Sequence, residues 1–290
     1  MYVKSSILFL LLTSSLLGMS CSPKVVSKIV LQNYPPFEPY ESFALFEKND
    51  SFQIDHFKTI GQIEIKESGL SLLCDYETVK DLAVKRARQM GGNCLRIVEH
   101  KEPNAWSTCH RIKCDVLIIE HPEEFEKKIL WHEKRKLRIH DFKGDTTQRH
   151  SQAATMSGFS YKYVYVPIRG KTDIQVETIF DCINSYFKRS KNDQLVLQHE
   201  QIHFDISELY ARKFKQRILE ECLYFKEFES KHNKIFQEVN QELLRKQDQY
   251  DAEVYPNPQK QQEWTNWIKN ALLESESYRL EQIVNKHNTK

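Results

Sequence analysis

The alternation of hydrophobic and polar residues predicts a small mixed module between residues 60 and 119. Ile60–Ile65 alternates apolar and polar residues, as a half-buried strand does. Tyr76–Met90 carries its apolar residues at helical spacing, and Gly91-Gly92 follows it. Two short apolar runs come next, Cys94–Val98 and Arg111–Ile119. These segments predict a β-α-β-β module.

A second group of strands is predicted after residue 135. Lys136–Phe142 alternates like a strand, Ser157–Val166 places aromatic residues on one face, and Thr172–Phe180 supplies an antiparallel partner. The stretch from Lys171 to Tyr255 contains neither Gly nor Pro, and helical periodicity dominates after Asp193. We therefore expect an α+β protein, in which the small module precedes an antiparallel sheet and a long, mostly helical C-terminal half.

Composition narrows the classes of function. The 290 residues carry 42 Lys and Arg against 40 Asp and Glu, a formal net charge of +2. This balance argues against a strongly basic nucleic-acid binder, so we expect no nucleic-acid partner. A hydrophobic fraction of 40% is too high for wholesale disorder. The length suits one large or two modest domains.

The N-terminus has the pattern of an export signal. Lys4 provides a positive charge, Ile7–Leu17 is an apolar run too short to span a bilayer comfortably, and small residues lead to Cys21. Residues 1–20 resemble a bacterial lipoprotein signal peptide, which implies that Cys21 carries the lipid and that the protein is anchored in the cell envelope, at the outer membrane, facing the periplasm or the outside. Gly18 stands where such signals usually carry Leu. The alternative is an ordinary secretory signal with a chance cysteine.

Export changes the interpretation of the other cysteines. An even number in an oxidising compartment favours disulfides over a metal cluster or a thiol nucleophile. Four fall between residues 74 and 114, which suggests two bridges in one small unit. The remaining two form either a third bridge or free buried thiols. The six residues are Cys74, Cys94, Cys109, Cys114, Cys182 and Cys222.

Four short motifs carry a resemblance in the small module: Gly61-Gln62-Ile63, Cys74-Asp75-Tyr76, Gly92-Asn93 and Cys109-His110-Arg111-Ile112. Residues 55–120 resemble the small disulfide-bonded domain of the Rcs envelope-stress lipoprotein and its relatives. The resemblance implies a Cys74–Cys109 bridge and leaves Cys94 and Cys114 as a second pair.

The segment His199-Glu200-Gln201-Ile202-His203 is an H-E-x-x-H motif. Residues i and i+4 share one face of an α-helix, so His199 and His203 can place two imidazole nitrogens on one Zn²⁺. Glu200 would then act as general base toward the water that the metal activates. The alternative is a charged helix face that happens to hold two histidines.

The surroundings of this motif carry a second resemblance, in four segments: His140-Asp141-Phe142-Lys143-Gly144, Ala153-Ala154-Thr155, His199–Arg212, and Tyr250-Asp251-Ala252-Glu253 with Gln262-Glu263-Trp264. These segments resemble a family of uncharacterised bacterial secreted proteins that is grouped with zincin-type metallopeptidases. The match covers residues 130–275. It implies a zincin-like fold and a zinc-dependent activity.

The third zinc ligand has three candidates: Asp251, Glu253 and Glu221. Catalytic zinc usually has three protein ligands plus water. Glu221 lies where some zincins place a glutamate on a second helix, but no breaker separates it from His203. In the related family we expect a histidine shortly after the Tyr-Asp pair, and Pro256 stands there, so Asp251 or Glu253 would substitute.

The sequence therefore supports five segments: a signal peptide (1–20), a Pro-rich tether (21–50), a small disulfide-bonded α/β domain (51–121), a connector (122–135) and a zincin-like metallopeptidase domain (136–290). The leading interpretation is an envelope lipoprotein that hydrolyses a peptide or protein substrate with Zn²⁺. The alternative is a non-catalytic envelope sensor or scaffold with a degenerate metal site. A third possibility is a redox switch at Cys109 and Cys114.

Overall fold

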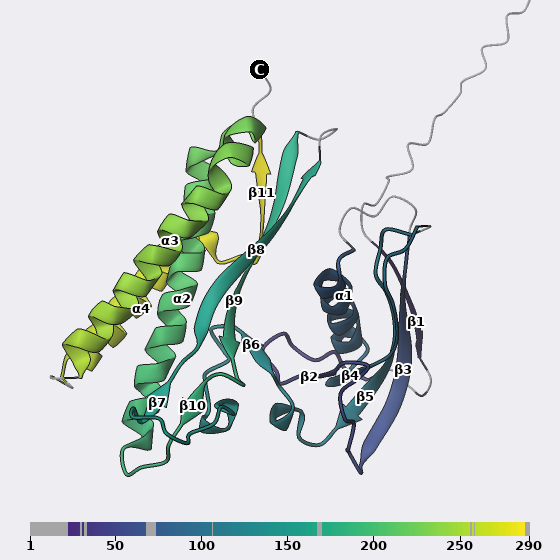
Figure 1. Ribbon diagram of the computed structural model, residues 1–290, viewed down its shortest axis with the longest axis horizontal. Coiled ribbons are helices and arrows are strands. Elements are labelled where there is room, and N and C mark those ends of the chain that lie inside the picture. The colour runs from purple at the N-terminus through teal and green to yellow at the C-terminus, as the bar shows by residue number, and fades with distance from the viewer. Residues whose placement is uncertain are drawn as a thin grey trace, which may run out of the picture.

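The computed structural model describes residues 23–29, 31, 34–67, 74–105, 107–166, 170–255, 257 and 259–287. The expected signal peptide and Cys21 lie outside these residues. Within the described chain, each helix is too short or too polar to cross a membrane. The fold is α+β, as the sequence predicts, and Figure 1 shows two sheets with α1 lying between them.

The first unit is a five-stranded sheet in the order β1-β3-β5-β4-β2 with one helix on its face. Its elements are β1 (Lys24–Ile29), β2 (Ala44–Phe46), β3 (Phe57–Lys66), α1 (Tyr76–Gln89), β4 (Cys94–Lys101) and β5 (Arg111–Ile119). All pairs are antiparallel except β2 with β4. The predicted β-α-β-β module is confirmed as β3-α1-β4-β5. Asp75 caps α1 by accepting the Thr78 N–H, and Gly91, with φ of 81°, follows its end.

The prediction of a tether over residues 21–50 is wrong for the part of this stretch that is described. β1 pairs along β3, and β2 lies parallel to β4 in the sheet. Phe43, Ala44 and Phe46 are buried. Burial of the short apolar run from 43 to 46 against the hydrophobic face of the sheet is favourable. This gain outweighs the preference of the neighbouring prolines for a free, extended chain.

Cys74 and Cys109 form a disulfide, as the resemblance implies. The second pairing, between Cys94 and Cys114, is wrong because both thiols are free and lie on opposite faces of the sheet. Cys114 packs in the core under α1, whereas Cys94 packs against Leu117 on the other face. Cys182 and Cys222 are also free, and each is buried in a different hydrophobic cluster.

The second unit is built around β9 (Lys171–Asp181). β8 (Ser157–Val166) pairs along its whole length with one edge of β9. On the other edge of β9, β11 (Gln282–Lys286) pairs with the beginning of the strand and β6 (Lys128–Leu130) with its end. A separate pair of short strands joins β7 (Ala153–Ala154) to β10 (Tyr186–Phe187). The strands predicted at Ser157–Val166 and Thr172–Phe180 are thereby confirmed.

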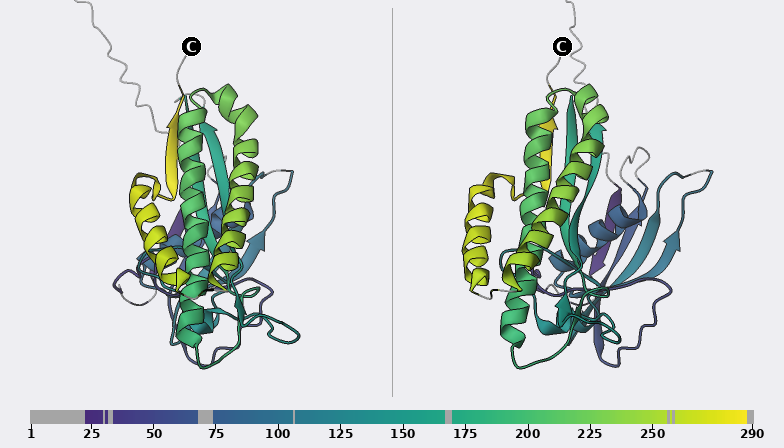
Figure 2. Two further views of the ribbon diagram at one scale, coloured as in Figure 1. Left: turned by 90° about the vertical axis from the view of Figure 1, so that its left-hand side faces the viewer. Right: turned by 60° about the vertical axis from the view of Figure 1, so that its left-hand side comes forward.

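Three helices lie on one side of this sheet: α2 (Asp193–Glu221), α3 (Phe225–Val254) and α4 (Lys260–Glu274). Figure 2 shows α2 between α3 and α4, and α2 also contacts β8 and β9. Their shared core contains Phe214, Phe228 and Tyr250, all fully buried. The glycine-free half is helical, as predicted, and α2 is its central element.

The strand predicted at Lys136–Phe142 is wrong. Ile139–Asp141 forms a 3-10 helix instead, because the buried Asp141 carboxylate accepts the Arg138 N–H at 2.6 Å and turns the chain. The segment predicted as a connector, 122–135, is instead part of the folded second unit. It contains β6, and its last residue, Arg135, is 4% exposed.

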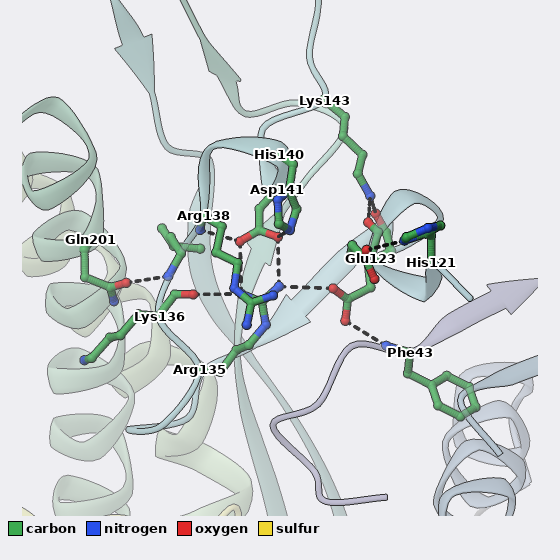
Figure 3. Close-up of polar contacts among 12 residues, drawn as sticks. Phe43, His121, Glu123, Arg135, Lys136, Arg138, His140, Asp141, Lys143 and Gln201 are labelled. Carbon is green, nitrogen blue, oxygen red and sulfur yellow. Dashed lines mark hydrogen bonds and ion pairs between the residues drawn. The ribbon is translucent and has the colours of Figure 1, made fainter. Parts of the chain in front are cut away.

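A buried polar network joins the two units (Figure 3). Arg135 donates to both oxygens of Asp141 at 2.8 and 3.0 Å and to Glu126 at 3.1 Å. The other oxygen of Glu126 accepts the backbone N–H of Phe43, in the first unit, at 3.0 Å. On the opposite side, the Leu137 N–H donates to Gln201 of α2 at 2.8 Å. The network thus runs from the first unit, at the residue before β2, to the helix that carries the H-E-x-x-H motif.

Candidate metal centre

The H-E-x-x-H motif lies in the second and third turns of α2. The helix runs for 29 residues because its sequence contains no Gly or Pro, and its central face packs on the sheet and on α3. His199 and His203 project from one face toward α3, as their i, i+4 spacing predicts. Their side chains are 8% and 12% exposed.

Asp251 of α3 completes a group of three possible ligands. Its Oδ1 lies 3.0 Å from His199 Nε2 and 2.9 Å from His203 Nε2, and the two imidazole nitrogens are 3.0 Å apart. These atoms form a nearly equilateral triangle. Among the described residues, His199, His203 and Asp251 are the group of three His, Cys, Asp or Glu side chains that could hold a metal ion, with ligand atoms within 4.8 Å of one another.

The ionisable groups at the triangle shift the pKa values of Asp251 and His203. Burial alone would raise the pKa of Asp251, but the hydrogen bonds and charges of His199 and His203 outweigh it and hold the pKa well below its usual range. Burial would lower the pKa of His203, but Asp251 and Glu200 raise it. The site therefore carries an ionised carboxylate beside two imidazole nitrogens, an arrangement that favours a bound positive charge.

Glu200 lies inside the protein next to the triangle. It is 2% exposed, and its Oε2 is buried without a hydrogen-bond partner among the described residues. Burial raises the pKa of Glu200, an effect that the charges of His203 and His199 oppose. A buried carboxylate oxygen with a spare lone pair is suited to accept a proton from a bound water.

Two tyrosines enclose the histidines. The Tyr250 ring stacks on His199 with centroids 4.6 Å apart and meets the His203 ring edge-on at 5.0 Å. The Tyr255 ring lies 5.2 Å from His199 and is 64% exposed. Burial raises the pKa of both phenols, that of Tyr255 to about 12. Both hydroxyls therefore stay protonated at neutral pH, and the Tyr250 hydroxyl is buried without a partner in the described chain.

The other two candidates for the third ligand lie elsewhere. The Glu253 carboxylate accepts hydrogen bonds from Trp264 at 2.9 Å and Gln249 at 2.8 Å. Glu221 ends α2 and pairs with Arg217 at 2.6 Å. It lies 18 residues after His203 on one helix, which is about 27 Å along the axis. Asp251 alone of the three predicted candidates lies at the site.

Gln247 is a site residue that the sequence analysis missed. Its Oε1 contacts His203 Nδ1, and its Nε2 donates to the His203 carbonyl at 3.0 Å and to Ser207 Oγ at 3.3 Å. Gln247 lies four residues before Asp251 on α3, so the two share a helix face. That spacing is the signal that points to it once Asp251 is taken as a ligand.

The donor set fits a zinc ion. Two imidazole nitrogens and one carboxylate oxygen are the ligands that catalytic Zn²⁺ takes in proteins, with a fourth position for water. The edges of a tetrahedron with bonds of about 2.1 Å are about 3.4 Å long, so small shifts would fit the 2.9–3.0 Å triangle to the ion. Comparison with protein-family models, curated proteins and solved structures finds no match for this chain.

Proposed function

We propose that the chain is an envelope lipoprotein whose C-terminal domain hydrolyses peptide bonds with a zinc ion held by His199, His203 and Asp251. The observation that carries this proposal is the triangle of their ligand atoms, with sides of 2.9–3.0 Å. Hydrogen bonds along all three sides would need three protons on these atoms. Each Nε2 carries at most one hydrogen, and the ionised carboxylate of Asp251 carries none. One shared cation satisfies all three atoms at once.

The residues around the triangle have the roles that hydrolysis requires. A bound Zn²⁺ supplies Lewis acidity, which makes water acidic and polarises a carbonyl group. Glu200, buried beside the ligands, accepts the proton of the attacking water through its unpaired Oε2 and passes it to the leaving amine. Tyr250 stacks on His199 and shields this side of the site from solvent.

The envelope location rests on the N-terminal segment. The apolar run Ile7–Leu17 and the small residues before Cys21 support export and lipid attachment. The Cys74–Cys109 disulfide suits an oxidising compartment. We propose that the lipid on Cys21 places the metal domain at the membrane surface, where it acts on a peptide or protein.

A non-catalytic envelope sensor or scaffold is the second candidate. One observation favours it: the position where the related family is expected to carry a histidine is Pro256, and Asp251 takes the third place in the triangle. A bound metal would then order α2 against α3 without turnover. Metal content and hydrolysis, measured on the same sample, separate the two functions.

The test compares the wild-type chain with Glu200→Gln. We expect one zinc per chain in both and a loss of hydrolysis of roughly 10²–10⁴-fold in the variant, measured on fluorogenic casein and a mixed peptide library. Glu220→Gln, an exposed position on the same helix, is the control and should keep full activity. Unchanged hydrolysis in Glu200→Gln would exclude the mechanism. Zinc without hydrolysis in the wild type would favour the sensor, and a wild type without zinc would refute both the metal site and the peptidase.

A further inference from the structure

We infer that Gln247 is a positioning residue for the metal centre: it holds a proton on His203 Nδ1 and so leaves His203 Nε2 free to bind the metal. This inference builds on the proposed function, since it concerns the same site. It assigns a role to a side chain on α3 that does not itself belong to the triangle. The evidence is the direction of each hydrogen bond around the amide.

The amide of Gln247 can be oriented in one way only. Its Nε2 lies 3.0 Å from the carbonyl oxygen of His203, and a carbonyl oxygen accepts hydrogen bonds but never donates them. The NH₂ group must therefore face that oxygen. Its second hydrogen is directed to Ser207 Oγ at 3.3 Å. The amide oxygen then faces the imidazole ring of His203.

The orientation of the amide fixes the tautomer of the ring. Gln247 Oε1 is an acceptor, so the nitrogen that it contacts, His203 Nδ1, must carry a hydrogen. In a neutral imidazole the other nitrogen then has a free lone pair. That nitrogen, Nε2, is the one that lies 2.9 Å from Asp251 and 3.0 Å from His199. Outer partners of this kind fix the ring orientation of metal-binding histidines.

The amide is itself anchored to the sheet. Ser207 is fully buried on α2, and its Oγ lies 2.8 Å from Ser157 Oγ at the start of β8. Ser207 Oγ also donates to the His203 carbonyl at 3.2 Å. The chain of contacts from Ser157 through Ser207 to Gln247 therefore ties the ring of His203 to three elements: β8, α2 and α3.

One face of α3 thus supplies both a ligand and the residue that prepares a ligand. Gln247 and Asp251 are four residues apart, so they lie one turn apart on the face that packs on α2. His199 is oriented differently, by the stacked Tyr250 ring at 4.6 Å. Loss of the Gln247 amide should therefore affect His203 and leave the stacking at His199 in place.

The experiment measures zinc affinity and the His203 tautomer on the full chain. In a competition with a chromogenic zinc chelator, we expect Gln247→Leu to bind zinc roughly 10–100-fold more weakly than wild type. Gln249→Leu is the matched control, because Gln249 lies on the same helix, is exposed, and bonds to Lys246 and Glu253 rather than to the triangle. Equal zinc affinity in Gln247→Leu and wild type would overturn the inference.

The tautomer is read by nitrogen NMR of histidine-labelled protein, with the His203 signal assigned from a His203→Gln variant. We expect a hydrogen on Nδ1 of His203 in wild type, with and without zinc. A bare Nδ1 would overturn the inference. This measurement needs no variant of Gln247 to fold. A wild type that binds no zinc would end the proposed function, while the NMR of the metal-free chain would still decide the role of Gln247.

Discussion

Asp251 Oδ1 lies 2.9 Å from His203 Nε2, although the two residues are 48 positions apart in the sequence. The turn between α2 and α3 folds the second helix back along the first, and this brings the end of α3 to the start of α2. The carboxylate is therefore held in place by helix packing rather than by a local loop. A ligand placed in this way should be sensitive to its charge and tolerant of changes at neighbouring exposed positions.

Asp251→Asn should weaken zinc binding by roughly 100-fold or more, beyond the 10–100-fold loss typical of outer-shell partners, because it removes the negative charge from the triangle. Glu253→Gln is the matched control. Glu253 was an equal candidate in the sequence, but its carboxylate bonds to Trp264 and Gln249 away from the site. Chelator competition on both variants checks this. Equal zinc affinities in the two would show that Asp251 is not a ligand.

The choice between Asp251 and Glu253 illustrates what the sequence alone could predict about the site. His199 and His203 lie on one helix, so their spacing predicts that they share a face. The third ligand lies on a different helix. Asp251 and Glu253 point about 200° apart around α3, and only the packing of α3 on α2 decides which one faces the histidines. Gln247 was missed for the same reason.

The fold was predictable where one side of an element is buried. The alternation in Ser157–Val166 reproduces β8, and the helical period in Tyr76–Met90 covers all of α1 and one residue more, because burial of one face imposes the period. The prediction failed at Lys136–Phe142, where the pattern alternates but Asp141 binds Arg135 and the chain turns. An ion pair between two side chains does not show in the alternation of hydrophobic and polar residues. The role of Phe43 was missed because its partner, Glu126, is 83 residues away.

Arg135→Met should destabilise the protein by about 3–5 kcal/mol, since it leaves the carboxylates of Asp141 and Glu126 buried without their cationic partner. Arg138→Met, on the exposed side of the same segment, should change stability by no more than about 0.5 kcal/mol. Urea unfolding of both variants measures the difference. A small effect of Arg135→Met would mean that the two units are not held together through this network.

The disulfide makes a separate contribution to the first unit. Cys74 and Cys109 close a loop with a sequence separation of 35, and a loop of this length is stabilised by about 3–4 kcal/mol in the chain-entropy model. The double variant Cys74→Ala/Cys109→Ala should therefore melt at a lower temperature than the oxidised wild type.

Thiol titration of the unfolded, unreduced chain, with Cys21 replaced by Ser, should find four free cysteines: Cys94, Cys114, Cys182 and Cys222. A count of two or none would contradict the disulfide pattern.

The stability of the helical half should depend on pH through His232 of α3. Burial lowers the pKa of His232, whose Nδ1 shares a hydrogen bond of 2.6 Å with the Tyr161 hydroxyl. Below its ordinary pKa of about 6.5, the unfolded chain binds a proton at His232 that the folded chain does not bind. Stability is therefore complete above that pH and is lost as the pH falls through the lower pKa of the folded state.

We expect the free energy of unfolding of wild type to fall between pH 7.5 and pH 5. It should fall less in His232→Gln, whose amide offers both a donor and an acceptor to Tyr161 but does not titrate. The variant should be less stable at pH 7.5, because it loses the stacking of His232 on Phe228. His150→Gln, at an exposed loop position, should leave the pH dependence unchanged. Urea unfolding at both pH values decides the point. If His232→Gln and wild type lose stability in parallel, His232 is not the group that titrates, because the two chains differ in no other ionisable side chain.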